Sequence, residues 1–202
     1  MVGIIDYGAG NLRSVQKAVE YLGYDAVISK DREEILSCDR VILPGVGNFG
    51  DASLKLKKEN LVQTIYDVIE KGTPFLGICL GFQLLFESSE EAQGVCGLGL
   101  IPGIVKRIPD TGLKIPQMGW NSLSFKPSPL FESVPLESYV YFVHSYYAHA
   151  KNPEDVIATT EYGISLDVAV QKKNLYGVQF HPEKSSKTGL KMLQNFIKED
   201  GR

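Results

Sequence analysis

A cysteine flanked by glycines is the feature of this sequence best suited to covalent chemistry. Cys79 is the central residue of the segment GICLG at 77–81, which follows one apolar run and precedes another. The pattern has the form of the G-x-S-x-G nucleophile turn, with cysteine in place of serine. Such glycines let the chain turn sharply and let a substrate come close, so we predict that the thiol is presented at the carboxyl end of a strand.

The element that follows Cys79 would influence the state of its thiol. We predict a helix that begins directly after this residue, because the N–H groups of a helix N-terminus carry partial positive charge and favour a thiolate. The alternative interpretation is a buried structural cysteine beside glycines that packing requires. The match to the nucleophile turn makes the catalytic interpretation the stronger of the two.

A histidine and a glutamate two residues apart form the second candidate site. His181 and Glu183 flank Pro182 directly after an apolar stretch. Side chains alternate along an extended chain, so both would point to the same side, and the proline keeps His181 out of the helical region. The carboxylate would then set the imidazole tautomer and stabilise the imidazolium. The alternative is a histidine in a turn beside a solvated glutamate.

These two candidates complement each other, because a nucleophilic cysteine needs a base. The chain has three histidines. We expect His149 to lie in a mobile stretch with no carboxylate beside it, and His144 to lie in the middle of a strand. We therefore predict that Cys79 is the nucleophile, His181 the base and Glu183 the carboxylate that orients the base. Their order in the chain is no obstacle, since such triads assemble in space.

A glycine-rich loop supplies a competing hypothesis. Gly45, Gly47 and Gly50 match the pattern G-x-G-x-x-G. Glu70 lies at a suitable distance along the chain for a ribose contact, so a dinucleotide-binding module is the alternative. That fingerprint normally occupies the first βα turn of its fold, where this chain has Arg13 in place of the third glycine. A glycine loop at a strand end can equally offer backbone N–H groups to an oxyanion, as cysteine acyl chemistry requires.

Composition and charge narrow the class of protein further. The chain has 202 residues, of which 44% are apolar, enough for one α/β domain with a full core. A net charge of −3 and a pI near 5.7 argue against a nucleic-acid partner. The longest uncharged run is too short to span a membrane, and the N-terminus lacks the positive region of a signal peptide.

The number and spacing of the cysteines indicate whether the protein could bind zinc and whether its cellular compartment is reducing. The three cysteines form no C-x-x-C pair, which argues against a disulfide scaffold or a cysteine zinc site and favours a reducing cytoplasm. The spacing H-x-E at His181 also occurs in zinc deaminases, but the segment P-C-x-x-C that accompanies it there is absent. We therefore predict no metal site and no cofactor.

Apolar periodicity predicts the elements that position these residues. In the first half, short apolar runs alternate with amphipathic stretches, which is typical of a mostly parallel sheet with helices on both faces. The second half has five of the ten prolines between 109 and 135, which predicts an irregular segment, and then β-rich runs. We expect one α/β domain over residues 1–202, an open mostly parallel sheet extended by an antiparallel β section. The expected strands are 2–6, 26–29, 40–43, 75–79, 139–147, 156–160, 167–171 and 175–180, and the expected helices include 12–22, 61–69 and 190–197.

Several motifs in one chain make it similar to a known family. With GICLGFQ at 77–83, HPE at 181–183 and PGVGNFG at 44–50, the sequence resembles the class I (triad) glutamine amidotransferases. The resemblance covers nearly the whole chain, and PGVG, MGWN and HPEKSS are similar to the glutaminase subunits of imidazole glycerol phosphate synthase, which acts in histidine biosynthesis. Phe82 departs from the methionine common in the family, and we expect that side chain only to pack. The resemblance implies a flavodoxin-like fold.

The resemblance also implies roles for particular residues. Cys79 would attack the side-chain amide of glutamine, His181 would relay protons and Glu183 would orient His181. The remaining implied residues are Gly47 and Leu80 as oxyanion donors, and Gln83, Ser145 and Tyr146 as holders of the two ends of glutamine. Alternatives for these last three are a polar residue in a helix and two ordinary strand residues.

A partner is implied as well. The ammonia would pass to a cyclase subunit with a (β/α)8 barrel, in a heterodimer that makes imidazole glycerol phosphate and aminoimidazole carboxamide ribonucleotide. Trp120, Tyr141 and Lys184 would lie against that subunit, although they could also be ordinary surface residues. The alternative functions are the glutaminase subunit of another amidotransferase and a stand-alone cysteine hydrolase.

Overall fold

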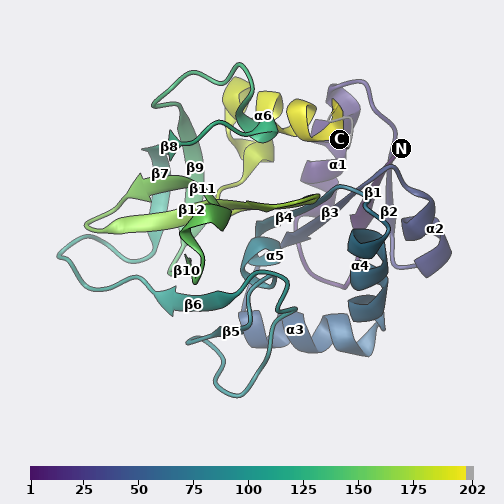
Figure 1. Cartoon of the computed structure of the whole chain (residues 1–202), viewed down its shortest axis with the longest axis horizontal. Coiled ribbons are helices and arrows are strands. Elements are labelled where there is room, and N and C mark those ends of the chain that lie inside the picture. Colours follow the sequence, from purple (N-terminus) through teal and green to yellow (C-terminus); the bar gives the residue numbers. More distant parts are fainter. Residues whose placement is uncertain (199–202) are drawn as a thin grey trace.

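The computed structural model describes residues 1–198, and its largest feature is a sheet whose parallel half lies between two layers of helices (Figure 1). Neighbouring strands in this half are parallel. Several are buried along their whole length, which explains why they are continuous apolar runs in the sequence and not alternating patterns. From the edge inward the strands are β2 (Ala26–Ser29), β1 (Val2–Ile5), β3 (Arg40–Gly45), β4 (Phe75–Cys79) and β13 (Leu175–Val178).

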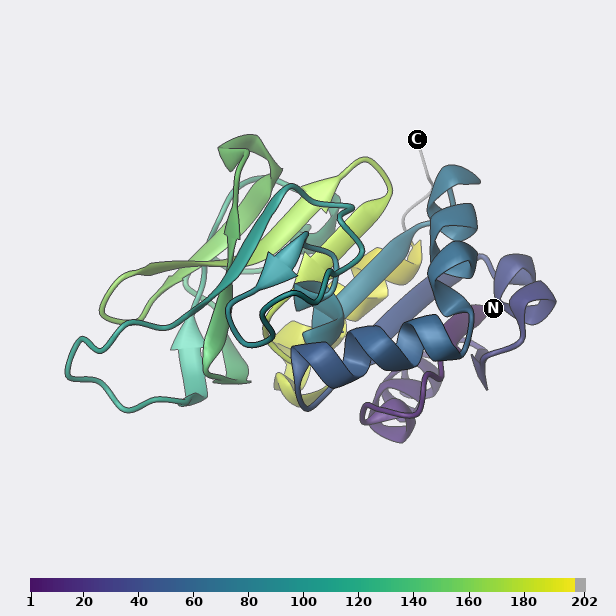
Figure 2. The same cartoon turned by 90° about the horizontal axis from the view of Figure 1, so that it is seen from below.

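Two pairs of helices cover the two faces of the parallel half. On one face lie α1 (Leu12–Tyr21) and α6 (Ser186–Lys198), and on the other lie α3 (Phe49–Lys58) and α4 (Leu61–Glu70), as Figures 1 and 2 show. Each layer closes its own apolar cluster against the sheet. Burial on both faces provides the main driving force for this arrangement.

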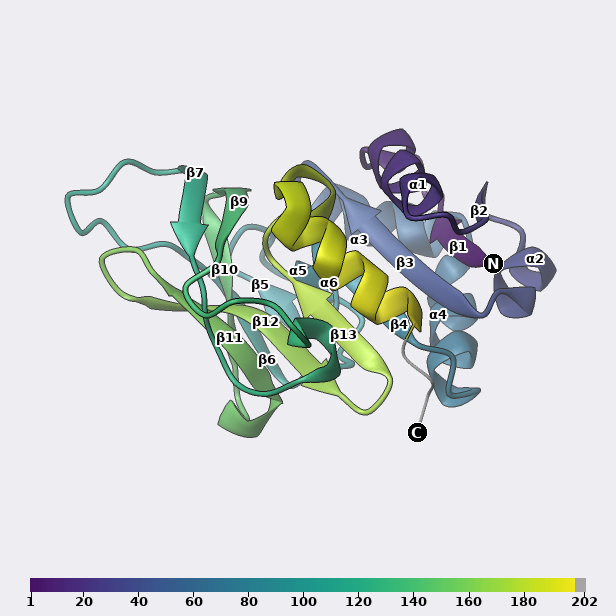
Figure 3. The same ribbon diagram turned by 90° about the horizontal axis from the view of Figure 1, so that it is seen from above.

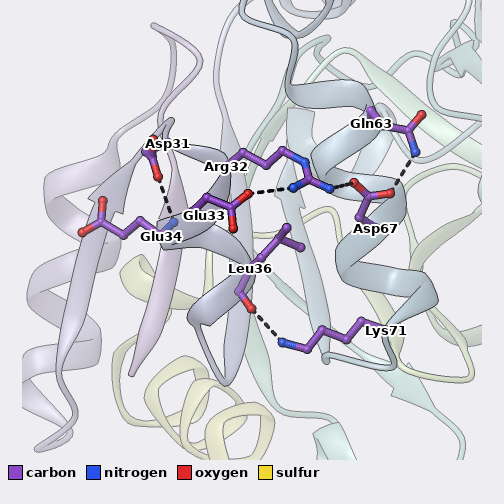
Figure 4. Close-up of polar contacts among 8 residues, drawn as sticks. All are labelled: Asp31, Arg32, Glu33, Glu34, Leu36, Gln63, Asp67 and Lys71. Carbon is purple, nitrogen blue, oxygen red and sulfur yellow. Dashed lines mark hydrogen bonds and ion pairs between the residues drawn. The ribbon is translucent and has the colours of Figure 1, made fainter.

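A short helix, α2 (Arg32–Ser37), lies beside α4 and is joined to it by polar contacts (Figure 4). Arg32 donates to Asp67 at 2.7 Å, and Lys71 donates to a main-chain carbonyl of α2 at 2.8 Å. These exposed contacts are screened by solvent and contribute little to stability. Ile35 is fully buried and packs α2 against the apolar cluster on this face of the sheet.

The sheet continues beyond β13 as an antiparallel section, as the sequence predicts. Next to β13 lie β12 (Ser165–Lys172), β10 (Tyr146–Ala150) and β6 (Gly103–Arg107), each antiparallel to its neighbour, and then the short β5 (Ser88–Ser89). β11 (Val156–Glu161) pairs with β12, and β8 (Ser124–Phe125) pairs with β11. His149 is in β10, so the expectation that it lies in a mobile stretch is wrong.

A separate two-stranded sheet, called here the β7–β9 ribbon, consists of β7 (Gln117–Ser122) and β9 (Tyr139–His144). It lies at the end of the molecule away from β1 and β2, beside the start of α6 (Figure 3). β7 falls within the proline-rich stretch that we expected to be irregular. That expectation is wrong here because the prolines flank β7 without interrupting it.

The run 139–147, expected as one strand, is two strands in different sheets. It breaks at Ser145, after which the chain leaves the ribbon and joins the main sheet as β10. The remaining elements are α5 (Leu80–Gln83) and the 3-10 helices η1 (Pro129–Phe131), η2 (Pro153–Asp155) and η3 (Pro182–Lys184). No helix within residues 1–198 combines the length and apolar character needed to span a bilayer.

Candidate active site

Cys79 lies at a sharp turn between β4 and α5. Its backbone angles are φ 56° and ψ −109°, a region that residues with a side chain rarely adopt. The flanking glycines are required by packing. A Cβ on Gly77 would lie 2.7 Å from the carbonyl oxygen of Gly81, and a Cβ on Gly81 would lie 1.9 Å from that of Leu43. The sequence prediction of a nucleophile turn at a strand end therefore matches the backbone that the structure has.

The helix predicted after Cys79 is present, but it is short. α5 is one turn of four residues, Leu80–Gln83, and all four are buried. The bonds that follow are of the tighter i to i+3 kind, from Leu85 N to Phe82 O and from Phe86 N to Gln83 O. Any influence of this helix on the thiol must therefore come from the N–H groups of its first turn.

His181 and Glu183 form a buried pair. Nδ1 of His181 lies 2.8 Å from Oε1 of Glu183, and their side chains are only 3% and 1% exposed. The backbone at His181 is extended, with φ −100° and ψ 95°, as the following proline requires. The two side chains meet as predicted, but the expected reason is wrong, because Glu183 lies in the 3-10 helix η3 (Pro182–Lys184) and not in an extended segment.

The surroundings of His181 favour its charged form. Burial lowers its pKa, but contacts with Cys79 and Glu183 outweigh burial and raise the pKa to about 9. Nδ1 is occupied by the carboxylate, whereas Nε2 has no hydrogen-bond partner among residues 1–198. Nε2 is therefore available to exchange a proton with Cys79, which lines the same pocket.

Gln179 is a residue of the site that the sequence analysis did not single out. It is fully buried, and its Nε2 lies 3.8 Å from Sγ of Cys79. Its Oε1 accepts a hydrogen bond from Gln83 at 2.9 Å. The available indication was a glutamine within an apolar run, two residues before His181, since an amide that becomes buried needs polar partners.

The glycine loop after β3 lies against the cysteine turn. Gly45 is paired in register with Cys79, and a Cβ on Gly45 would lie 2.6 Å from the Tyr7 hydroxyl and 2.8 Å from the Gly81 nitrogen. Gly47 has φ 104° and open space where a Cβ would be. The loop thus combines a tightly packed base with an unhindered glycine that faces the pocket.

A pocket of about 440 Å³ opens above the cysteine. Its size is suitable for a small metabolite. The structure brings together at this pocket residues that are far apart in the sequence, and its walls include Gly47, Cys79, Leu80, Gln83, Ser145, Tyr146 and His181. Gln83 donates to the carbonyl of Tyr146 at 2.9 Å, so its side chain is held toward the wall that Ser145 and Tyr146 form.

His144 lies in another wall of this pocket and is uncharged. Burial lowers its pKa to about 4, and the charge of His181 acts in the same direction. Nδ1 is 2.8 Å from the carbonyl of Tyr146, and Nε2 is 3.0 Å from the side-chain amide of Gln117. A neutral ring that donates from Nδ1 needs a donor at Nε2. The amide nitrogen of Gln117, otherwise unpartnered within residues 1–198, fills that role when the amide is turned toward the ring.

Glu91 is a second pocket residue that the sequence analysis missed. It lies in the irregular segment after β5, and its Oε2 accepts a hydrogen bond from the N–H of Phe49 at 2.7 Å. No motif marks it in the sequence. It reaches the pocket only because its loop folds back over the start of α3.

The residues expected at a partner interface lie on the outer side of the β7–β9 ribbon and next to it. Trp120 is 52% exposed and is paired in register with Tyr141, with ring centroids 6.1 Å apart in an edge-to-face arrangement. Met118 and Tyr139 of the ribbon are 63% and 59% exposed. Lys184 is exposed directly after Glu183. The ribbon side chains form an apolar, aromatic surface, and its residue Tyr141 is bonded through its main chain to His181.

The described residues offer no separate metal centre. Within residues 1–198, no group of three or more histidine, cysteine or carboxylate side chains is arranged to hold a metal ion. All three cysteines are unpaired. The chemistry that the site itself can perform is nucleophilic attack by a thiol assisted by a histidine.

The fold and this site define a class of enzyme. The sequence matches the family model described as "Glutamine amidotransferase class-I" over residues 3–199. A crystal structure described as that of a glutamine amidotransferase shares the fold, with a TM-score of 0.76 at 18% sequence identity over 98% of this chain and 97% of that chain. The chain belongs to the class I glutamine amidotransferases.

Two relatives point to a particular member of that class. "Imidazole glycerol phosphate synthase subunit HisH" of Moorella thermoacetica is 54% identical, over 96% of this chain and 93% of its own length. The subunit of the same name in Methanocaldococcus jannaschii is 53% identical, over 98% of both chains. The similarity to this subunit therefore extends from end to end.

Proposed function

We propose that this chain is the glutaminase subunit of an imidazole glycerol phosphate synthase and releases ammonia from L-glutamine at Cys79. The observation that carries the catalytic part is the geometry of three side chains. A cysteine in a strained turn shares a pocket with a histidine whose far nitrogen is held by a buried glutamate. Identity above 50% over the whole chain to subunits of that enzyme supports the pathway, which is histidine biosynthesis.

The first half of the reaction forms a thioester. Sγ of Cys79 attacks the side-chain amide carbon of glutamine, and the thiol proton is carried by Nε2 of His181. The amide oxygen becomes an oxyanion, and we assign its stabilisation to the backbone N–H groups of Leu80 and Gly47, since both residues line the pocket. When the tetrahedral intermediate collapses, His181 gives its proton to the departing nitrogen, and ammonia leaves.

The second half uses water in place of the thiol. Water attacks the thioester carbon while His181 takes its proton, and collapse of the second intermediate returns that proton to the sulfur as glutamate leaves. The raised pKa of His181, about 9, suits this cycle because the imidazolium persists at neutral pH until the leaving nitrogen accepts the proton. Glu183 stabilises the imidazolium and holds its orientation throughout.

Residues in the walls of the pocket would hold the other end of glutamine. Gln83 and the main chain at Ser145 and Tyr146 offer donors and acceptors to the α-carboxylate and α-ammonium groups. The carboxylate of Glu91, in the same pocket, has the charge that an α-ammonium group requires. The dinucleotide alternative is disfavoured because Gly45 is packed against the cysteine turn and leaves no space for a pyrophosphate there.

The decisive experiment measures ammonia release from glutamine by the wild type and by Cys79→Ala. We expect loss of activity by several orders of magnitude, since the residue is the covalent nucleophile. The matched control is Cys96→Ala, which removes an exposed cysteine outside the pocket and should retain full turnover. Substantial hydrolysis by Cys79→Ala would show that the nucleophile is assigned wrongly.

The ammonia acceptor is proposed to be a cyclase subunit with a (β/α)8 barrel, bound as a heterodimer in the cytoplasm. The exposed aromatic surface of the β7–β9 ribbon supports this, because aromatic side chains are typical anchors of protein interfaces. Its position beside Glu183 also suits an enzyme whose product must pass to a partner before it escapes into water.

This interface is tested with Trp120→Ala, Tyr141→Ala and Lys184→Ala. We expect weaker affinity for the cyclase and weaker stimulation of glutaminase turnover, with folding intact because the side chains are not part of the core. A matched control is Tyr21→Ala, an aromatic residue that is 79% exposed on α1. Unchanged affinity in all three variants would remove the interface assignment. A wild type that hydrolyses glutamine but does not bind the cyclase would favour another amidotransferase.

A further inference from the structure

Ser185 lies buried between the β7–β9 ribbon and the catalytic histidine. The residue is 0% exposed, and its hydroxyl makes two hydrogen bonds. It accepts from the N–H of Tyr141 in β9 at 3.0 Å, and it donates to the carbonyl of His181 at 2.6 Å. One side chain therefore connects the main chain of β9 to the main chain of the proposed base.

Tyr141 is attached to the catalytic turn through both of its backbone groups. Its N–H is bound by Ser185, and its carbonyl accepts a hydrogen bond from the N–H of His181 at 3.0 Å. Its side chain meanwhile packs edge-to-face with Trp120 on the outer surface of the ribbon. A single residue thus belongs to the exposed aromatic surface and also fixes the backbone that carries the imidazole.

Within residues 1–198 the ribbon has no strand pairing with the main sheet. Its strand β9 is held by the core packing of Val140 and Phe142 and by its continuation into β10, and the bonds of Tyr141 add a direct polar connection to the catalytic turn. At its far end, β7 is joined to β11 by a hydrogen bond from the Thr160 hydroxyl to the Ser122 carbonyl at 2.6 Å. If the ribbon moved, the two main-chain hydrogen bonds of Tyr141, to Ser185 and to His181, would move the backbone of His181 with it.

The turn beyond Glu183 leaves little room for other arrangements. The carbonyl of His181 also accepts from the N–H of Lys184 at 3.0 Å, and a Cβ on Gly189 would lie 2.1 Å from the carbonyl of Pro182. The turn from His181 to Ser185 is therefore clamped against the start of α6. Such packing makes the turn behave as a rigid unit that follows β9.

We propose that Ser185 is a positioning residue whose hydroxyl couples the place of the His181 imidazole to strand β9, and through it to the aromatic surface of the ribbon. This inference rests on the proposed function, because it gives that docking surface a direct route to the base. A displacement of about 1 Å at a catalytic group can cost on the order of a hundredfold in rate. A partner that fixes the ribbon would therefore raise turnover without touching the pocket.

The test compares Ser185→Ala with Ser185→Cys and with Ser53→Ala. Ser53 is also buried, at 4% exposed, and its hydroxyl donates to the carbonyl of Cys96 at 2.7 Å, but it lies in α3 away from β9. For each variant we would measure glutaminase kcat and KM alone and with the cyclase, cyclase affinity, and the pKa of His181 by NMR. We expect Ser185→Ala to lower kcat on the order of 10- to 100-fold with KM little changed, and to reduce the stimulation by the cyclase.

The same variant should bring the pKa of His181 down from about 9, because the ring would no longer be held against Cys79 and Glu183. Cyclase affinity should be unchanged, since the hydroxyl is fully buried. Ser185→Cys, which keeps a weak donor of similar size, should be intermediate, and it carries the test if the alanine variant does not fold. Ser53→Ala should match the wild type in kcat, stimulation and pKa, because a lost buried hydroxyl alone does not move the histidine.

Each outcome bears on one claim. If wild type and variants all fail to hydrolyse glutamine, the proposed function is wrong. If the wild type is active and Ser185→Ala or Ser185→Cys retains its kcat, its stimulation and the pKa of His181, this inference is overturned and the proposed function stands. If Ser53→Ala reproduces the effects of Ser185→Ala, the role of Ser185 is general stability and not positioning, which also overturns it.

Discussion

His181 and His144 lie in two walls of the same pocket and are almost equally buried, with 2% and 6% of their surfaces exposed. Burial lowers the pKa of both, yet one has a pKa of about 9 and the other of about 4. The difference comes from their partners. His181 has the Glu183 carboxylate at Nδ1 and Cys79 nearby, whereas His144 is held by a carbonyl and an amide.

This contrast shows that burial alone does not decide whether a histidine can serve as an acid and base. A charged partner makes the imidazolium of His181 stable although its side chain is almost fully buried, and neutral partners keep His144 uncharged. The neutral ring still has a structural use. It fixes the carbonyl of Tyr146, to which Gln83 also donates, and so shapes the wall proposed to bind glutamine.

The largest expected effect separates the two histidines by function. His181→Ala should lower kcat for glutamine hydrolysis by roughly a thousandfold or more, because loss of a triad base costs about as much as loss of the nucleophile. The matched control is His149→Ala, which changes an exposed histidine in β10 and should leave turnover intact. Steady-state ammonia release is the measurement, and a modest loss in His181→Ala would contradict its role as the base.

Replacing the charged partner should make His181 more like His144. In Glu183→Gln we expect the pKa of His181 to fall below about 9, since the carboxylate that raises it is gone. Turnover should fall by roughly a hundredfold, less than for His181→Ala, because an orienting carboxylate matters less than the base it serves. NMR titration of the histidine ring follows the pKa. A pKa that stays near 9 would mean that Cys79 alone sustains the shift.

The opposite shifts should also appear in the pH dependence of stability. The pKa of His181 is above 6.5 in the folded state, so its contribution is complete below pH 6.5 and is lost as pH rises toward 9. The pKa of His144 is below 6.5, so its burial destabilises the fold progressively as pH falls from 6.5 toward 4. The free energy of unfolding should therefore peak near pH 6.5, with each histidine accounting for up to about 3 kcal/mol.

Urea unfolding between pH 4 and 9 measures this dependence. In His181→Ala the free energy of unfolding should no longer fall as pH rises above 6.5, and in His144→Asn it should no longer fall as pH drops below 6.5. Each variant is therefore the control for the other. If the free energy of unfolding depends on pH in both variants as it does in the wild type, other groups cause that dependence.

The smallest expected effect is on catalysis by His144→Asn. We expect kcat to change by less than about tenfold and KM to rise more, because the ring supports the Tyr146 carbonyl and exchanges no proton with substrate. Loss of its buried hydrogen bonds should cost about 1–3 kcal/mol of stability. A fall in kcat as large as that of His181→Ala would mean that His144 takes part in proton transfer.

Much of this site could be predicted from the sequence because the signals are local. The turn at Cys79 needs glycines within two residues, and the pair at 181–183 consists of two side chains on either side of one proline, where the extended chain at His181 turns into the 3-10 helix η3. The parallel strands were predicted for a related reason, since burial on both faces leaves continuous apolar runs. The roles of these residues remain predictions until the variants above are measured.

Other parts of the site had no local signal. Glu91 belongs to an irregular loop and Gln179 directly follows strand β13, and both became site residues only through contacts with distant segments. The run 139–147 is rich in aromatic and β-branched residues, as one strand would be, yet it breaks at Ser145 where the chain passes from the β7–β9 ribbon to the main sheet. Composition cannot show which sheet a strand joins.

By itself the sequence determined the nucleophile turn, the histidine–glutamate pair, the parallel half of the sheet and the resemblance to an amidotransferase, since each depends on residues close together or on whole-chain motifs. Tertiary structure alone decided the opposite pKa shifts of His181 and His144, and the link from Tyr141 through Ser185 to the base. The physical reason is that electrostatic and hydrogen-bond partners are set by distance in space, and strands that meet across the pocket are separated by a hundred residues or so of chain, as Gln179 and Cys79 are.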